Sequence, residues 1–382
     1  MYDPSKIKIV KNRYLDRDYY IGDSYNAIIN ASIGTSLEND KFELEANKAQ
    51  IAIQAGASMI TDHSICGDIK KWHHELRENV HVPIGAVPIY ELALHNPRFS
   101  DKEALEIIEE YLERGFNILT LHSSVLKQDL ENEITKGRII PMTSKGGKAM
   151  LTRMMLTGSE NPFYTQFDEI LNIFKKYDAV ISLGPTYRPG SVVDNSDKED
   201  DAYWIEINRM SRLVKKAIKY QVPIIVEGIG HARMDMIPFF VRNSKKICCQ
   251  VPYRVMTVST DIALGYDNVS SAIASSISVL NGANIVTAVT PSEHIGLPSS
   301  KDVEEGVVAA KIAIHSAEIC IKDDITHDIK MSEERSRRKV CQGSIREAIF
   351  PQGVQEKLKD NDMLEGCSMC GSMCTFIYRD KE

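Results

Sequence analysis

Apolar runs alternate with amphipathic segments along most of the chain. Nine runs rich in Ile and Val are apolar almost throughout, which is typical of strands in a parallel sheet that helices cover on both faces. The segments between them place apolar residues at helical spacing among Glu and Lys. The predicted helices include 37–55, 101–114, 167–177, 205–220 and 301–321. The predicted strands are 27–34, 59–64, 83–89, 118–123, 138–144, 179–184, 223–229, 255–261 and 284–290.

Strands that alternate with helices predict an α/β fold. A (β/α)8 barrel explains the pattern best, with one predicted strand in surplus, and a doubly wound parallel sheet is the alternative. We expect the barrel to occupy residues 25–322, after a short N-terminal lead-in at 1–24. The polar residues 323–382 are then a tail, which we expect to carry cysteines rather than to form a second folded domain.

Composition narrows the class of protein. Of the 382 residues, 43% are hydrophobic and 26% charged, which fits a soluble globular chain with a sizeable core. The net charge of −7 argues against a nucleic-acid partner. The chain shows neither an apolar stretch long enough to cross a membrane nor the apolar segment of a signal peptide. We therefore expect a cytoplasmic protein with no membrane partner, whose thiols stay reduced.

Polar or titratable residues close nearly every predicted strand. In a (β/α)8 barrel the catalytic residues lie at these carboxyl ends, so the pattern predicts a functional site there. The residues are Ser32, Asp62 with His63, Tyr90, His122 with Ser123, Ser144 with Lys145, Arg188, Glu227 with His231, Asp261, and His294.

Two of these strand ends suggest particular ligands. His231 and His294 follow consecutive predicted strands, and two neutral imidazoles suit a divalent metal. Structural, hydrogen-bonded histidines are the alternative. The run Thr143-Ser144-Lys145-Gly146-Gly147-Lys148 resembles an anion cradle, because glycines free successive backbone N–H groups for a phosphate. An ordinary glycine loop is its alternative. Arg188 is able to bind an anion bidentately or to form a surface salt bridge.

Eight cysteines are present, and three of them cluster in the tail. Cys367, Cys370 and Cys374 form a C-x2-C-x3-C run, which can hold three irons of a [4Fe–4S] cluster and leave the fourth open to an external ligand. A zinc site completed by a distant cysteine and a redox-active thiol tail are the alternatives. The other five cysteines are expected to be small packing residues: Cys66, Cys248, Cys249, Cys320 and Cys341. Cys66 is set apart from the rest, because it lies just after a predicted strand end.

The order of several motifs resembles the thiamin pyrimidine synthase (phosphomethylpyrimidine synthase) family of non-standard radical S-adenosylmethionine enzymes. The resemblance runs from about Ile29 to the C-terminus. It rests on Asn30-Ala31-Ser32-Ile33-Gly34, Val82 to Tyr90, Glu160-Asn161-Pro162, Ser182-Leu183-Gly184 with Arg188-Pro189-Gly190, Glu227-Gly228 with Gly230-His231, Thr260-Asp261-Ile262-Ala263 with Gly265-Tyr266-Asp267, Thr290-Pro291 with Glu293-His294, and the Cys-Ser-Met-Cys-Gly tail.

The resemblance implies a barrel homodimer whose tail carries the cluster to the partner's active site. It implies 5-aminoimidazole ribonucleotide as substrate, S-adenosylmethionine as the radical source and an external electron donor. By position, it implies the [4Fe–4S] ligands Cys367, Cys370 and Cys374, and His231 and His294 as ligands of a second metal, zinc or iron. It further implies a substrate site, with Glu227 also catalytic, made of Ser32, Thr61, Tyr90, His122, Ser144, Lys145, Gly146, Arg188, Glu227 and Tyr253.

The chain departs from the family pattern around the expected substrate. Ser32 and Thr61 stand where the family has Asn and Met, Lys145 replaces an Arg, and Pro185 replaces an Asp. Lys145 keeps the charge but loses the bidentate fork. The spacing of the last two cysteines is one residue shorter than in the bacterial form, and the extra N-terminal domain common in bacterial members is not expected here.

These departures leave more than one function open. The first hypothesis is a lyase that rearranges 5-aminoimidazole ribonucleotide to 4-amino-5-hydroxymethyl-2-methylpyrimidine phosphate for thiamin biosynthesis. The second is a paralogue that converts the same substrate to 5-hydroxybenzimidazole, the lower-ligand precursor of a cobamide. A zinc-tailed barrel with a binding role, and a metal-dependent hydrolase using His231 and His294, are hypotheses of other classes.

Overall fold

The computed structural model describes residues 2–37, 40–336, 347–359 and 373 of the chain. It divides into two compact units, Met1–Ala317 and Glu318–Glu382. The predicted cluster ligands Cys367, Cys370 and Cys374 lie outside the described residues. The tail that carries an iron–sulfur cluster therefore stays a prediction.

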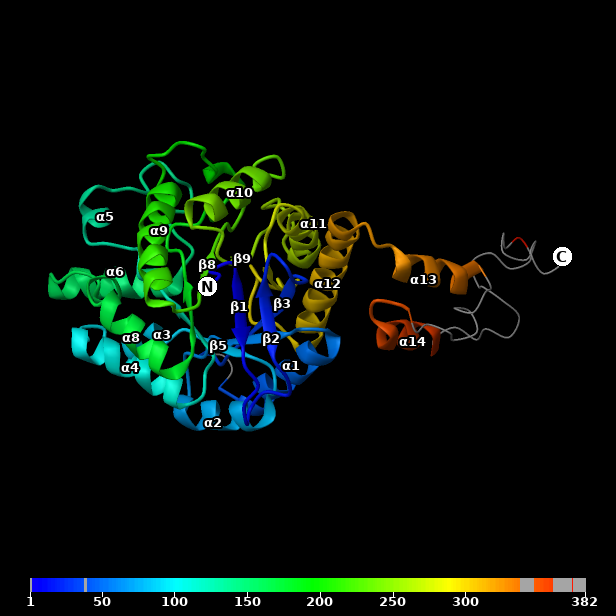
Figure 1. Ribbon diagram of the computed structural model, residues 1–382, viewed down its shortest axis with the longest axis horizontal. Coiled ribbons are helices and arrows are strands. Elements are labelled where there is room, and N and C mark those ends of the chain that lie inside the picture. Colours follow the sequence, from blue (N-terminus) through cyan, green and yellow to red (C-terminus); the bar gives the residue numbers. More distant parts are fainter. Residues whose placement is uncertain (1, 38–39, 337–346, 360–372, 374–382) are drawn as a thin grey trace. The chain divides into compact units, whose positions relative to one another are not determined.

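Eight parallel strands close into a barrel in the described part of the first unit, and helices surround them (Figure 1). The barrel order is β10-β3-β4-β5-β6-β7-β8-β9, and β10 pairs with both β3 and β9. This closure confirms the (β/α)8 barrel and excludes the open doubly wound sheet. The barrel strands are β3 (Ile28–Ile33), β4 (Met59–Asp62), β5 (Ile84–Ala86), β6 (Ile118–Leu121), β7 (Val180–Leu183), β8 (Ile224–Glu227), β9 (Tyr253–Val255) and β10 (Ile285–Thr287).

The helices of the first unit follow the predicted amphipathic segments closely. Side-chain caps set the starts of some of them: Ser100 and Glu103 form a capping box on α4, and Ser144 caps α6. The helices are α1 (Phe42–Ala55), α2 (Ile69–Asn79), α3 (Ile89–His95), α4 (Asp101–Glu113), α5 (Gln128–Glu131), α6 (Lys145–Thr157), α7 (Pro162–Thr165), α8 (Phe167–Tyr177), α9 (Ala202–Tyr220), α10 (Ile237–Ile247), α11 (Asp267–Leu280) and α12 (Ser300–Lys322), which continues past Ala317.

Two of the predicted strands differ from the structure. The segment 138–144 is a loop rather than a strand, because the backbone N–H groups of Ile139 and Ile140 donate to the Asp194 carboxylate instead of a neighbouring strand. It is the surplus strand of the prediction. The strand predicted at 255–261 is displaced, since β9 occupies Tyr253–Val255. Arg254 interrupts the apolar pattern there, yet it lies inside the barrel.

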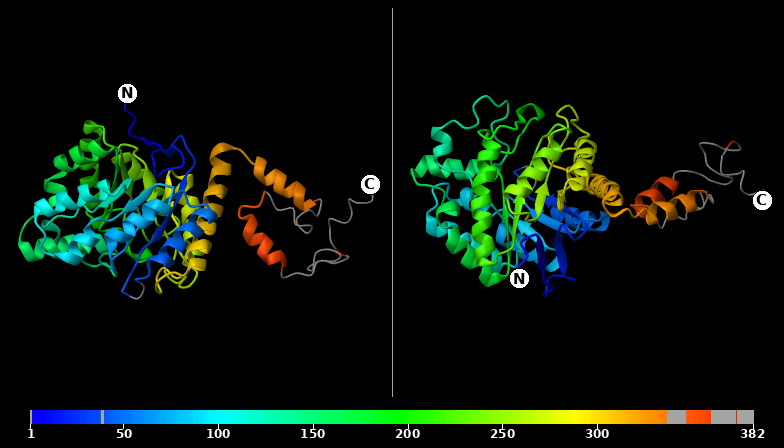
Figure 2. Two further views of the ribbon diagram at one scale, coloured as in Figure 1. Left: turned by 90° about the horizontal axis from the view of Figure 1, so that it is seen from below. Right: turned by 45° about the horizontal axis from the view of Figure 1, so that its top comes forward.

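The N-terminal segment forms a hairpin, which sequence patterning did not predict. Strands β1 (Lys6–Ile9) and β2 (Tyr19–Gly22) pair antiparallel, and the segment is dark blue in Figure 2. Two of its contacts fall just before barrel strands: the Tyr2 hydroxyl donates to the Val222 carbonyl before β8, and Asp23 accepts from Asn284 before β10. Asp23 also pairs with Lys245, near the end of α10. The hairpin segment therefore covers the amino ends of the strands and leaves their carboxyl ends open.

The second unit contains α13 (Thr326–Ser336) and α14 (Pro351–Lys359), and α13 has no buried residue. Among the described cysteines, Cys248 is buried as expected, Cys66 and Cys249 are half-buried, and Cys320 is exposed, so the packing prediction is wrong for Cys320. Within the described ranges, no helix is both long and apolar enough to cross a membrane.

Candidate active site

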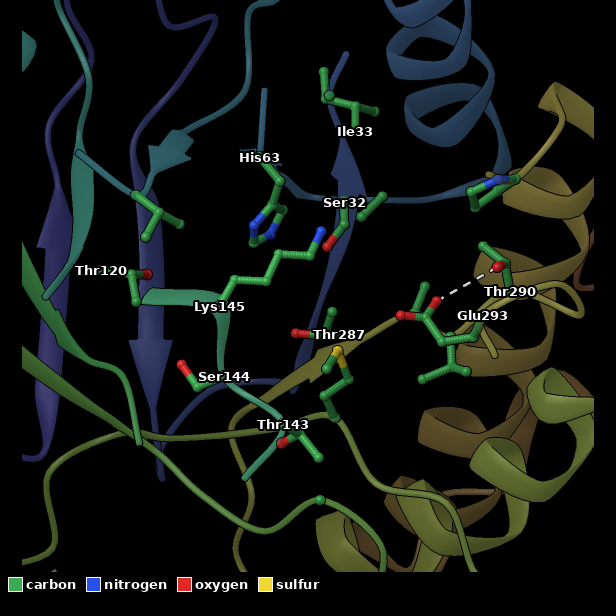
Figure 3. A pocket seen from close by; sticks show the side chains of 18 of the residues that line it. Ser32, Ile33, His63, Thr120, Thr143, Ser144, Lys145, Thr287, Thr290 and Glu293 are labelled. Atoms are coloured by element: carbon green, nitrogen blue, oxygen red, sulfur yellow. Dashed lines mark hydrogen bonds between the residues drawn. The ribbon is translucent and has the colours of Figure 1, made fainter. Parts of the chain in front are cut away.

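A cavity of about 740 Å³ opens at the carboxyl ends of the barrel strands (Figure 3). Its volume suits a small-molecule ligand. Ten of the strand-end side chains predicted from the sequence line it, and Pro185 also lines it. The ten are Ser32, His63, Tyr90, His122, Ser144, Lys145, Arg188, Glu227, His231 and His294.

One wall of the cavity is the amino end of α6, where backbone N–H groups and the helix dipole favour an anion. Ser144 caps the helix by accepting from the Gly147 N–H at 3.1 Å, and its Oγ lies 2.7 Å from His122 Nε2. A Cβ at Gly146 would overlap the His122 ring, so only glycine lets the helix start approach this histidine. In Figure 3, the Lys145 side chain extends into the cavity toward Ser32 and His63. We call Ser144, Lys145, Gly146 and His122 the anion cradle.

The histidine of the cradle is neutral at physiological pH. Burial lowers the pKa of His122 to about 4, and the same cause, reinforced by the charge of Arg254, lowers the pKa of His63 to about 4. Within the described residues, the buried Nδ1 of His122 has no hydrogen-bond partner. The ring is thus a hydrogen-bonding group with one nitrogen to spare, rather than a fixed charge.

A second wall carries two histidines that face each other. The Nε2 atoms of His231 and His294 lie 3.2 Å apart. Each Nδ1 is held by a carboxylate: His231 by Asp261 at 2.7 Å, and His294 by Asp267 at 3.0 Å. Metal-bound histidines in proteins have this arrangement, in which a carboxylate fixes the tautomer and aims the other nitrogen at the ion.

The donor set fits a divalent metal. Burial lowers the pKa of His231, which favours the neutral imidazole that binds metal. The described residues contain no group of three or more His, Cys, Asp or Glu that could hold an ion. An ion held by these two histidines alone would have room for water or a bound molecule, as in a catalytic site rather than a closed structural one.

The loop after β7 brings Arg188 to the cavity. Its Nε donates to Thr143 Oγ1 at 3.2 Å, next to the anion cradle, and it makes no ion pair within the described ranges. Buried Glu206 on α9 fixes this loop by accepting the backbone N–H groups of Thr186 and Tyr187 at 2.7–2.9 Å. The predicted salt-bridge alternative for Arg188 is therefore not what the structure contains, and its guanidinium is placed for an anion.

The floor of the cavity is unexpectedly polar. Barrel interiors are usually filled by Val, Ile and Leu, but seven strands here contribute polar side chains to one hydrogen-bonded layer. The Glu227 carboxylate accepts from Thr120 at 2.9 Å and Ser182 at 2.8 Å, and pairs with Arg254 at 3.3 Å. We call this the polar layer; its members are Asn30, Thr61, Thr120, Ser182, Glu227, Arg254 and Thr287.

Three predicted substrate contacts do not line the cavity. Thr61 lies in the polar layer and donates to Asn30 at 2.7 Å. Gly146 is covered by the His122 ring. Tyr253 is fully buried, with its hydroxyl 2.8 Å from that of Tyr203 and accepting from the Ile229 N–H, so it supports the backbone after β8.

Sequence reasoning named Thr61 and Glu227 but missed the hydrogen-bonded layer that contains them, and it missed the carboxylate of Asp267. Thr and Ser within apolar runs do not disturb the pattern of a buried strand, and Arg254 was placed before a strand rather than within one. Asp267 was quoted only as part of a motif. A signal for it was available, because it begins a helix directly after a glycine-containing loop.

Comparisons with known proteins identify the family of the chain. Residues 5–381 match the model of the Radical SAM ThiC family. A phosphomethylpyrimidine synthase of Thermoanaerobacter sp. (strain X514) is 36% identical, over 93% of this chain and 84% of that protein. Those of Pyrococcus furiosus and Thermus thermophilus are 35% and 34% identical, over 93% of this chain and 84% and 83% of theirs.

Similarity to solved structures is weaker. A dihydropteroate synthase from Xanthomonas albilineans has a TM-score of 0.46 and 9% identity, over 80% of this chain and 96% of that chain, which carries no argument about this protein. The match to the family model covers nearly the whole chain, and the relatives named above agree with it. The chain therefore belongs to the radical SAM ThiC family.

Proposed function

We propose that the protein is a radical S-adenosylmethionine lyase that rearranges 5-aminoimidazole ribonucleotide to 4-amino-5-hydroxymethyl-2-methylpyrimidine phosphate, a precursor of thiamin. One observation carries the proposal: a single cavity joins an anion cradle to a carboxylate-backed histidine pair in a chain of this family. The relatives' name, phosphomethylpyrimidine synthase, supports this product.

Different residues of the cavity would bind different parts of the substrate. The N–H groups at the start of α6, the Ser144 hydroxyl and the Lys145 ammonium would hold the phosphate, and Arg188 would close on it from the neighbouring loop. Burial raises the pKa of Tyr90 to about 12, which keeps its hydroxyl a hydrogen-bond donor at the cavity wall. Glu227, at the floor, would accept a hydrogen bond from the substrate.

The proposal includes three groups that act with these residues. Cys367, Cys370 and Cys374 would hold a [4Fe–4S] cluster, and His231 with His294 a divalent metal, zinc or iron. With S-adenosylmethionine and an external electron donor, the cluster would supply a carbon radical able to break an unactivated C–H bond. A homodimer, in which the tail reaches the partner's cavity, completes the proposal.

Anaerobic product analysis tests the proposed function. The full chain, reconstituted with iron and sulfide, is incubated with 5-aminoimidazole ribonucleotide, S-adenosylmethionine and a reductant, and the products are identified by mass spectrometry. The expected result is the pyrimidine phosphate together with 5′-deoxyadenosine. A protein that takes up no iron and sulfide, or that turns over without S-adenosylmethionine, would contradict radical chemistry and favour the zinc-tail or hydrolase hypotheses.

A second product is favoured by a specific observation. Three of the four departures from the family pattern, Ser32, Lys145 and Pro185, line the cavity. The fourth, Thr61, accepts from Arg254 in the polar layer at 3.4 Å. Departures from the family pattern that lie around one ligand are expected when an enzyme acts on the family's substrate but rearranges it to a different product. The same incubation discriminates, since 5-hydroxybenzimidazole would replace the pyrimidine phosphate in the mass spectrum.

A further inference from the structure

Arg254 links the two halves of the polar layer. Its Nε donates to Thr287 at 2.9 Å and its Nη2 to Thr61 at 3.4 Å, on the side of β10, β3 and β4. Its Nη1 pairs with Glu227 at 3.3 Å, on the side of β6, β7 and β8. The residue is 6% exposed and lines the cavity. The buried side chain of Arg254, on β9, thus connects the two sides of the barrel beneath the ligand site.

The hydrogen bonds of Glu227 leave one of its oxygens for a ligand. Thr120, Ser182 and Arg254 all contact Oε1, and no described residue donates to Oε2. A guanidinium has five N–H groups, and Arg254 uses three of them within the described ranges. An acceptor and unused donors therefore stand side by side at the cavity floor.

The polar layer and the anion cradle are separated by about the length of a ribose, roughly 7 Å. Thr120 on β6 contacts Glu227, whereas His122, two residues further along the chain, contacts Ser144 of the cradle. Two residues of a strand span about 7 Å. A ribonucleotide whose phosphate occupies the cradle would place its ribose across this distance and its base against Glu227 and Arg254.

We propose that Arg254 is a specificity-determining residue, which with Glu227 forms a fixed donor–acceptor pair that recognises the polar edge of an amino-substituted heterocycle. This inference rests on the proposed function and deepens it, because it assigns the recognition of the base to two residues. A site built to hydrogen-bond a ligand rejects an analogue that leaves its buried polar groups unpaired.

Electrostatics keep the pair in the required state. Burial alone would raise the pKa of Glu227, but the Arg254 charge, the hydrogen bond from Ser182, the Arg188 charge and the Thr120 hydroxyl lower the pKa below its usual value. His63, His122 and Tyr90 also face this carboxylate, and all three are neutral near pH 7. Glu227 is therefore an ionised acceptor whenever the ligand binds.

The test compares two probes on the anaerobically reconstituted full chain, without S-adenosylmethionine so that nothing turns over. Dissociation constants of 5-aminoimidazole ribonucleotide and of ribose 5-phosphate, which lacks the base, are measured by calorimetry. The variants are Arg254→Met and Arg254→Lys. The lysine variant keeps the charge without the fork and remains measurable if loss of a buried partner unfolds the methionine variant. Arg153→Met is the matched control, since Arg153 is equally buried and pairs with Asp101, outside the cavity lining.

The expected result is a loss of selectivity. Wild type should bind the ribonucleotide at least about tenfold more tightly than ribose 5-phosphate, and both Arg254 variants should lose most of this ratio while their affinity for ribose 5-phosphate stays within about twofold. Arg153→Met should keep the ratio. If wild type prefers the ribonucleotide and the Arg254 variants keep that preference, the role of Arg254 is wrong and the proposed substrate stands. If wild type binds the two probes equally well, the role of Arg254 and the proposed substrate are both wrong.

Discussion

Two pairs of histidines line the same cavity in different surroundings. The deep pair, His63 and His122, lies beside the polar layer and the anion cradle, and burial lowers the pKa of each to about 4. The rim pair, His231 and His294, is backed by Asp261 and Asp267. Burial also lowers the pKa of His231, but only the rim pair has carboxylates that hold its Nδ1 atoms and aim its Nε2 atoms at one point. On this difference rests our proposal that the deep pair hydrogen-bonds a ligand and the rim pair binds a metal.

The largest expected difference between the two pairs is in metal binding. His231→Ala and His294→Ala each remove half of the protein's donors to the ion, so either variant should lose nearly all bound divalent metal after dialysis, measured by elemental analysis. His122→Gln, from the deep pair, is the matched control and should retain it. Equal metal loss in the control would show that the two pairs do not differ in this way.

The carboxylates behind the rim pair should matter less than the histidines. Asp267→Asn keeps the size of the side chain but weakens its hold on His294 Nδ1, and outer carboxylates of this kind are worth about 10- to 100-fold in metal affinity. Metal titration with a competing chelator measures the loss. Asp302→Asn, at the start of α12 and outside the cavity lining, is the control. An unchanged affinity in Asp267→Asn would contradict the assigned role.

Removing the Ser144 hydroxyl should weaken ligand binding and leave metal binding unchanged. Ser144→Ala loses the cap of α6 and the contact with His122, so the affinity for ribose 5-phosphate should fall by about five- to tenfold, and stability by about 1 kcal/mol. Calorimetry and denaturant unfolding measure the two effects. A stability loss without an affinity loss would mean that Ser144 is only a cap.

The smallest expected effect is a change in the pH dependence of stability. The pKa of His122 is about 4 in the folded chain and near 6.5 when unfolded, so the unfolded chain binds a proton first as the pH falls. Stability due to the neutral ring is full above pH 6.5 and is lost toward pH 4. Between pH 6.5 and 5.5, His122→Gln should lose about 1 kcal/mol less unfolding free energy than wild type. Identical slopes in urea unfolding would contradict a buried, neutral His122.

The barrel and ten of the side chains that line the cavity could be predicted from the sequence for a common reason. Apolar runs between amphipathic segments are a strong signal, and in a barrel every strand delivers its next residue to one end, so Ser32, His122 and Glu227 had to converge. The loop at 138–144 misled because Ile139 and Ile140 look like strand residues, and only the distant Asp194 shows why they are not. Arg254 was missed because its cost of burial is offset by Glu227, a partner on another strand that local patterns do not reveal.

The central claim is that the ligand held in this cavity donates the hydrogen atom in the radical reaction. The most direct measurement uses 5-aminoimidazole ribonucleotide deuterated throughout its ribose, incubated with the reconstituted chain, S-adenosylmethionine and a reductant under anaerobic conditions. The account predicts 5′-deoxyadenosine that carries deuterium. The amount of labelled 5′-deoxyadenosine should rise as the amount of deuterated ribonucleotide falls. Unlabelled 5′-deoxyadenosine, formed at the same rate with and without the ribonucleotide, would contradict it.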